Sequence, residues 1–97
     1  MVRSIIWTKR ANRKFNEIIE FLEVEWNPTV VKNFVVRTYS IIELLAEWPY
    51  LGTLENSEHR IRGFRLTKHN KLFYRVTKKE IVVLNFFDNR QQSFKRI

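Results

Sequence analysis

Lysine and arginine gather in the last two-fifths of this 97-residue chain, and they are its side chains with the clearest binding chemistry. From His59 to Ile97 there are eleven of them against two acids, whereas residues 1–58 carry seven basic and eight acidic side chains. The bases alternate with aromatic and branched residues, which a merely solvated charged tail would lack. A folded basic surface of this kind binds phosphates and carboxylates, so we expect polyanions or acidic protein segments as partners.

Acid–base and metal chemistry has weaker support in the sequence. Histidine changes charge most readily near pH 7, and the chain has only two. His59 precedes a predicted strand and His69 lies in a predicted turn, where a surface histidine is the ordinary interpretation. The absence of cysteine excludes disulfides and thiolate zinc sites, and there is no glycine-rich phosphate loop. We therefore predict no cofactor and no bound metal.

Length and composition predict a single folded domain that spans residues 1–97. The hydrophobic fraction is 44% and includes eight phenylalanines, three tryptophans and three tyrosines, which is enough for one core. No apolar run approaches the roughly 18 residues of a membrane span, and the N-terminus lacks the apolar region of a signal peptide. We expect a soluble cytoplasmic protein without membrane contact.

Two amphipathic helices are predicted in the first half, after a short strand over residues 2–7. Thr8 can cap the first helix, about 8–24, in which apolar residues recur at steps of three and four. Asn27 and the proline after it begin the second helix, 28–48, and so short a connection predicts an antiparallel helical hairpin. The expected core contains Phe15, Ile18, Leu22, Phe34, Ile41, Leu45, Leu72, Tyr74 and Leu84.

The second half predicts three strands, about 59–66, 71–77 and 80–87, joined by short polar turns. Residues 50–58 are expected to form a loop. The order β-α-α-β-β-β is typical of an α+β fold in which the helical hairpin packs on one face of a mainly antiparallel sheet. The other face of the sheet is then left more open.

This order of elements, together with size and basicity, resembles the RelE/ParE superfamily of toxins from bacterial type II toxin–antitoxin modules. The resemblance covers nearly the whole chain and implies the RelE/ParE-like fold. It rests on residues 7–22, 48–52 (WPYLG), 60–64 (RIRGF), 68–76 (KHNKLFYRV) and 87–91 (FDNRQ).

The superfamily contains two activities that the fold alone does not separate. RelE-like members cut messenger RNA on the ribosome, and ParE-like members inhibit DNA gyrase. If the chain were such a nuclease, a metal-independent mRNA endoribonuclease, the resemblance would make Arg60, Arg62, Lys71 and Arg90 the catalytic residues around the scissile phosphate. The spacing of Arg60 and Arg62 would point both side chains to the same face of a strand.

The proton-transfer half of a nuclease site is missing from the sequence. Where RelE-like chains carry a tyrosine after the last arginine, this chain has Phe94, which has no proton to exchange. Arginine stays protonated in proteins and is a poor general base. We therefore favour a ParE-like toxin that inhibits DNA gyrase. A ribosome-dependent mRNA endonuclease is the alternative, and a non-toxic nucleic-acid-binding module is the second alternative.

The resemblance also implies a cognate antitoxin, which forms a hetero-oligomer with the toxin and relieves the growth inhibition that underlies plasmid stabilisation. Charge would draw an acidic antitoxin segment to the basic sheet face, and apolar anchors would slow its dissociation. Val36 and Tyr39 fall among polar positions of the second helix, which indicates either ordinary exposed apolar residues or a contact patch. The predicted contact residues are Val36, Tyr39, Tyr50, Leu51, Arg65 and Arg75.

Overall fold

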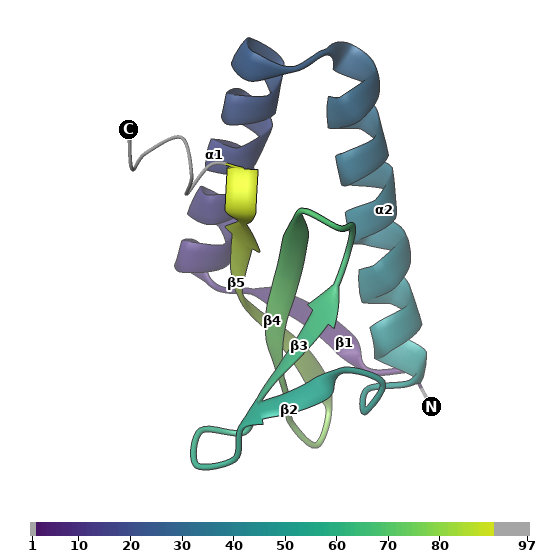
Figure 1. The fold of residues 1–97 in the computed structure, drawn as a ribbon. Coiled ribbons are helices and arrows are strands. Elements are labelled where there is room, and N and C mark those ends of the chain that lie inside the picture. The colour runs from purple at the N-terminus through teal and green to yellow at the C-terminus, as the bar shows by residue number, and fades with distance from the viewer. Residues whose placement is uncertain (1, 91–97) are drawn as a thin grey trace.

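Two helices pack against one face of a five-stranded sheet in the computed structural model, which describes residues 2–90 (Figure 1). In chain order the elements are β1 (Ser4–Trp7), α1 (Lys9–Glu25), α2 (Pro28–Glu47), β2 (Thr53–Asn56), β3 (Ile61–Arg65), β4 (Asn70–Val76) and β5 (Glu80–Asp88). Figure 1 shows the helices as an antiparallel pair joined at one end of the molecule. The predicted α+β fold is confirmed, with one strand more than the sequence indicated.

The strands lie in the order β1-β5-β4-β3-β2, so the first strand of the chain sits beside the last. The pair β1–β5 is parallel, and the other three neighbouring pairs are antiparallel. β1 therefore forms one edge of the sheet and β2 the other. The two longest strands, β4 and β5, lie inside the sheet and direct alternate side chains toward the helices and away from them.

Both helices begin where the sequence predicts. The side chain of Thr8 accepts a hydrogen bond from the backbone N–H of Ala11 at 3.0 Å, and Asn27 accepts one from Val30 at the same distance. These side chains satisfy backbone N–H groups that have no partner inside a helix. Pro28 follows the second cap directly, as the first residue of α2.

The core lies between the helical hairpin and the sheet. All the predicted core side chains except Leu84 are buried. Aromatic rings fill the space between the elements, because Phe15 packs against Trp7, Phe34 and Phe86 with ring centroids 5.1–5.3 Å apart. Among residues 2–90, every buried side-chain nitrogen and oxygen has a hydrogen-bond partner.

The prediction for Leu84 was wrong because β5 contains a bulge. Phe73 lies opposite Asn85, but the next residue of β4, Tyr74, lies opposite Val83, so Leu84 is an extra residue in its strand. A bulge disturbs the strict alternation of side chains. Leu84 is half-buried on the sheet face away from the helices, next to Asn85.

Two further expectations about the strands were also wrong. Residues 50–58 contain β2, a fully exposed edge strand that pairs with β3 and has an irregular register between Leu54 and Asn56. Its four residues lack the alternation that marks a strand, so only the pairing with β3 defines it. Arg60, which we placed in a strand, lies in the preceding turn with a left-handed φ of 56°.

Candidate functional site

The sheet face away from the helices carries a groove of about 630 Å³, which we call the open-face groove. Strand register explains how its residues meet: Ile61 lies opposite Arg75, and Phe73 lies opposite Asn85. Residues paired across neighbouring strands point to the same side of a sheet. The full lining is Thr8, Arg10, Glu55, Asn56, Ile61, Phe73, Arg75, Leu84 and Asn85.

Apolar and cationic side chains share this groove. Ile61, Phe73 and Leu84 offer apolar surface, while Arg10 and Arg75 carry positive charge. The Nε of Arg75 donates a hydrogen bond to the carbonyl oxygen of His59 at 3.0 Å, which orients the guanidinium. Recognition sites typically combine an apolar lining with a few placed polar groups. The groove therefore suits a ligand that presents both apolar and acidic groups.

An ion pair between Glu55 and Lys71 crosses the neighbouring strand β3. Both side chains are about a third exposed, and they meet above Gly63, where a Cβ atom would collide with both. An ion pair this exposed contributes about 0–1 kcal/mol. A glycine inside a strand destabilises it by roughly 0.5–1 kcal/mol relative to alanine. The arrangement therefore brings no clear gain in stability.

The four residues predicted for a nuclease do not share one surface. Arg60 is exposed in a turn, so it does not share a strand face with Arg62 as expected. Arg62 lies opposite the buried Tyr74 and thus points to the helix side of the sheet. Lys71 lies on the open face, between Arg65 and a residue of β5.

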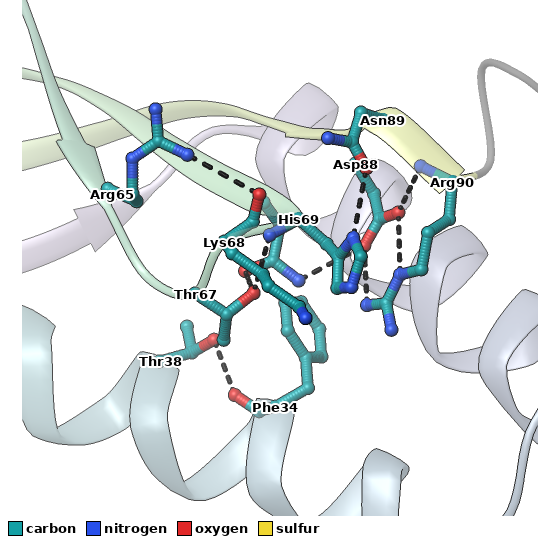
Figure 2. A network of polar contacts seen from close by, with 10 residues as sticks. Phe34, Thr38, Arg65, Thr67, Lys68, His69, Asp88, Asn89 and Arg90 are labelled. Atoms are coloured by element: carbon teal, nitrogen blue, oxygen red, sulfur yellow. Dashed lines mark hydrogen bonds and ion pairs between the residues drawn. The ribbon is translucent and has the colours of Figure 1, made fainter.

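Arg90 follows the end of β5, where Asp88 lies opposite Asn70, and it is held by the buried carboxylate of Asp88 (Figure 2). Its Nη2 and Nε donate to the two carboxylate oxygens at 2.9 and 3.2 Å. The guanidinium carbon also lies 5.3 Å from the centroid of the Trp26 ring, in cation–π geometry. This arginine therefore already has an anionic partner and an aromatic one.

The carboxyl group of Asp88 responds to two opposing influences. Burial raises its pKa, but hydrogen bonds from Arg90 and Asn70 and the charge of Arg90 outweigh burial, so the pKa lies below its ordinary value. Asn70 contributes a hydrogen bond from Nδ2 to Oδ2 at 3.0 Å. The carboxylate thus joins the beginning of β4 to the residues after β5.

Both histidines lie between strands. The backbone N–H of His59 donates to Asn56 Oδ1 at 2.9 Å. The Nδ1 of His69 lies 3.3 Å from Asn89 Oδ1, and Figure 2 places this histidine at the same end of the sheet as Arg90. Phe94 lies outside the described residues. His69, which lies two residues before Lys71, and Arg90 thus lie at one end of the sheet.

Residues 48–52 (WPYLG) are pinned to the helix side of the sheet. The buried hydroxyl of Tyr74 donates to the carbonyl oxygen of Pro49 at 2.7 Å and accepts from the N–H of Gly52 at 2.9 Å. Arg62 adds a 2.8 Å hydrogen bond to the carbonyl oxygen of Gly52 and lies 4.9 Å from the ring centroid of Tyr50. Burial raises the pKa of the Tyr74 hydroxyl, although the Gly52 hydrogen bond and the charge of Arg62 oppose the shift.

The predicted partner-binding residues fall on three surfaces. Arg65 and Arg75 lie on the open sheet face, and Tyr50 and Leu51 lie in the pinned segment, exposed by 62% and 52%. Val36 and Tyr39 are half-exposed on α2. The ring of Tyr39, however, lies 6.0 Å from the ring centroids of both Trp7 and Phe15, so part of this side chain covers the core.

Sequence reasoning missed five polar residues of the open-face groove: Thr8, Arg10, Glu55, Asn56 and Asn85. Arg10 lies in the first helix, outside the basic last two-fifths of the chain, and the place of Asn85 depends on the bulge in β5. Glu55 belongs to the strand that the sequence did not reveal. One available signal was Gly63, because a glycine inside a strand often marks close approach by another group.

Within residues 2–90, no helix is both long and apolar enough to span a membrane. The same residues contain no cluster of three or more histidine, aspartate or glutamate side chains suited to a metal ion.

Comparisons with solved structures find the same fold in several toxins. The chromosomal ParDE toxin–antitoxin system from P. aeruginosa contains a chain 19% identical, with a TM-score of 0.74 over 90% of this chain and 96% of that one. A chain of the RelBE2 complex from Mycobacterium tuberculosis is 16% identical, with a TM-score of 0.63 over 91% of this chain and 99% of that one. A chain of the E. coli DinJ–YafQ complex is 11% identical, with a TM-score of 0.62 over 94% of this chain and 97% of that one.

A search among curated proteins found no match. The sequence model of a toxin family, described as the ParE toxin of the type II toxin–antitoxin system parDE, matches residues 5–93. That span is nearly the whole chain and includes both helices and every strand residue except Ser4. The chain therefore belongs to the ParE toxin family of type II toxin–antitoxin systems.

Proposed function

We propose that this toxin inhibits DNA gyrase and that an acidic cognate antitoxin keeps it inactive. The observation that carries the gyrase assignment is the separation of Arg62, Lys71 and Arg90, each of which is engaged by another group of the chain. Cleavage of RNA without a metal needs cations and a proton donor around one phosphate. Cations that are dispersed and already paired do not provide that arrangement.

Family membership supports the same assignment, because the ParE-like branch of the superfamily is the one associated with gyrase. The missing phenol supports it independently, since Phe94 cannot donate a proton to a leaving oxygen. His69 lies near Arg90, but the side chain of Arg90 is bonded to Asp88 and stacked on Trp26. We therefore propose no catalytic role for that pair.

The antitoxin proposal rests on the chemistry of the open sheet face. Arg65 and Arg75 provide charge for carboxylates, and Phe73 provides apolar surface for an anchoring side chain. Tyr50 and Leu51 offer further anchors on the helix side of the sheet, and the segment that carries them is already ordered. Rigid anchors lose less entropy on binding. Similar structures whose descriptions name toxin–antitoxin complexes support a hetero-oligomer.

A gyrase assay and an RNA assay together test the proposed target. Purified toxin added to DNA gyrase and relaxed plasmid should abolish supercoiling, and induced expression should arrest growth. Primer extension on cellular messenger RNA should show no new cleavage ends. Intact supercoiling together with ribosome-dependent cleavage would instead establish the endonuclease.

Two variants distinguish further between gyrase inhibition and RNA cleavage. Phe94→Tyr restores the phenol of a RelE-like chain, and Lys71→Ala removes a predicted phosphate contact. A gyrase inhibitor should show no RNA cleavage with either variant. Arg13→Ala is a matched control, because Arg13 is an exposed helical cation that lies 3.9 Å from Glu17 and is far in sequence from the predicted site. Cleavage that rises with Phe94→Tyr and falls with Lys71→Ala would contradict the gyrase assignment.

A further inference from the structure

We propose that Glu55 determines the specificity of the open-face groove by excluding nucleic-acid phosphates and leaving the groove to a protein segment. This inference deepens the proposed antitoxin function and rests on it for the identity of that segment. Glu55 is the only acid among the groove-lining residues within residues 2–90. Its carboxylate is held in place by Lys71 above Gly63.

The open face would resemble a nucleic-acid-binding surface if Glu55 were neutral. Lys71 lies opposite Arg65 on one side and the aromatic Phe87 on the other, and Phe73 and Arg75 follow at alternate positions of the same strand. Proteins that bind single strands combine a cationic groove with aromatic side chains on which bases stack. This face has both components, and Glu55 is the lining residue whose charge opposes phosphate binding.

The ion pair between Glu55 and Lys71 weakens the attraction for nucleic acid in two ways. It neutralises Lys71, the cation between Arg65 and Phe87, and it places a negative charge at the groove where a phosphate would approach. Carboxylates and phosphodiesters offer only acceptors, so neither can donate a hydrogen bond to the other. A like charge at a binding surface suppresses the wrong class of partner more than it weakens the right one.

A contribution to the stability of the fold does not account for the ion pair above Gly63. An exposed ion pair adds little to stability, whereas the glycine that makes room for it weakens a strand. Glu55 and Lys71 are 16 positions apart and meet only because β2 and β4 flank the strand that carries Gly63. A feature that brings no net stability is more readily explained by binding.

A peptide segment matches the remaining groups of the groove. Arg10 and Arg75 can bind its carboxylates, and the apolar lining can hold a branched or aromatic side chain. The side-chain amides of Asn56 and Asn85 can both donate to and accept from a peptide backbone. Glu55 can accept a backbone N–H or a lysine of the segment. A peptide therefore satisfies this acid, and a phosphodiester does not.

The test measures binding of a fluorescein-labelled single-stranded RNA twelve-mer by fluorescence anisotropy at several salt concentrations. Glu55→Gln keeps the size of the side chain and removes its charge. We expect this variant to bind the RNA about fivefold or more tightly than the wild type at low salt. One added phosphate contact should also steepen the plot of log K against log salt by about 0.7.

Glu58→Gln is the matched control, because Glu58 is an exposed acid in the turn after β2 that does not line the groove. It changes the net charge of the protein by the same amount. The double variant Glu55→Gln/Lys71→Gln locates the effect, because most of the gain should disappear once the freed lysine is removed. Circular dichroism verifies that all these variants are folded.

Three outcomes would overturn the proposal: no gain with Glu55→Gln, an equal gain with Glu58→Gln, or a gain that survives undiminished in the double variant. The last two would indicate a general charge effect. The gyrase assay is separate from this measurement. A wild-type protein that leaves gyrase active would contradict the proposed target, and the comparison of RNA affinities would still decide the role of Glu55.

Discussion

The helix-covered face of the sheet is packed and fully hydrogen-bonded, whereas the open face of the same strands carries charged and half-exposed side chains. Within β4 the contrast is between neighbours: Leu72 and Tyr74 are completely buried, while Lys71, Phe73 and Arg75 are partly exposed. Alternate residues of a strand face opposite ways, so one strand serves two surfaces. One face is constrained by packing, and the other is free to be shaped by its partners.

The two glycines of the chain show the same contrast. A Cβ at Gly52 would lie 2.6 Å from the Tyr74 hydroxyl and 2.8 Å from the carbonyl oxygen of Gly63, and neither atom has space to move. A Cβ at Gly63 would instead meet the flexible ends of Glu55 and Lys71. The lack of a Cβ at Gly52 therefore makes room for groups of the packed interior. The lack of a Cβ at Gly63 makes room for an ion pair on the open face.

The largest expected effect is the difference between two identical substitutions on opposite faces. Leu45→Ala removes a completely buried side chain and should lower the free energy of unfolding by about 2–5 kcal/mol. Leu84→Ala should lower it by about 1 kcal/mol, because the side chain is half-buried in the groove and the surroundings gain no closed cavity. Urea unfolding of both variants measures the difference. Equal losses would show that the open face is as important for folding as the covered one.

The glycines provide the next comparison. Gly52→Ala should destabilise the protein by about 1–3 kcal/mol, because the buried Tyr74 cannot yield without losing its hydrogen bonds. Gly63→Ala should change stability by about 0.5 kcal/mol or less, since exposed side-chain ends can move aside. Thermal unfolding followed by circular dichroism compares them. The contrast fails if Gly63→Ala proves the more damaging change.

Low pH should lower the stability of the fold, because it protonates Asp88. Its folded-state pKa is depressed below the ordinary 3.8, so the stability that it contributes is present above that pH and is lost as pH falls through the folded-state value. Asp88→Asn should lower the free energy of unfolding at pH 7 by about 1–3 kcal/mol, because it weakens hydrogen bonds to Arg90. The difference in free energy of unfolding between the variant and the wild type should narrow below pH 3.8. Urea titrations at several pH values detect this, and a gap independent of pH would contradict it.

A cation of the groove should affect binding more than stability. Arg75→Ala should change the free energy of unfolding by about 1 kcal/mol or less, yet weaken binding of the cognate antitoxin about fivefold or more. Surface plasmon resonance measures the binding, with Arg13→Ala as the exposed control. Binding should weaken as salt rises but survive in part at about 1 M, where the Debye length is roughly 3 Å. Antitoxin affinity unchanged by Arg75→Ala would remove the groove from the proposed interface.

Much of the fold was predictable because its signals are local. Capping by Thr8 and Asn27 involves residues three positions away, and the helical periodicity identified the buried face of both helices. The errors arose where distant residues decide. β2 is defined by its pairing with β3, and the bulge at Leu84 appears only when β5 is aligned with β4. The candidate site was less predictable, since Arg62 and Lys71 look alike in sequence but lie on opposite faces.

The sequence by itself determined the order of the helices and of all strands but β2, the two caps, most of the core, and the concentration of positive charge in the last two-fifths of the chain. Those properties follow from periodicity, turn chemistry and composition, which act over a few residues. Only the tertiary structure decided which cations are free to bind. Glu55 reaches Lys71 across Gly63, and Asp88, which holds Arg90, is bonded to Asn70 of the neighbouring strand; the Glu55–Lys71 and Asn70–Asp88 contacts both depend on strand register. Register is set by packing of the whole sheet against the helices, so no local pattern announces it.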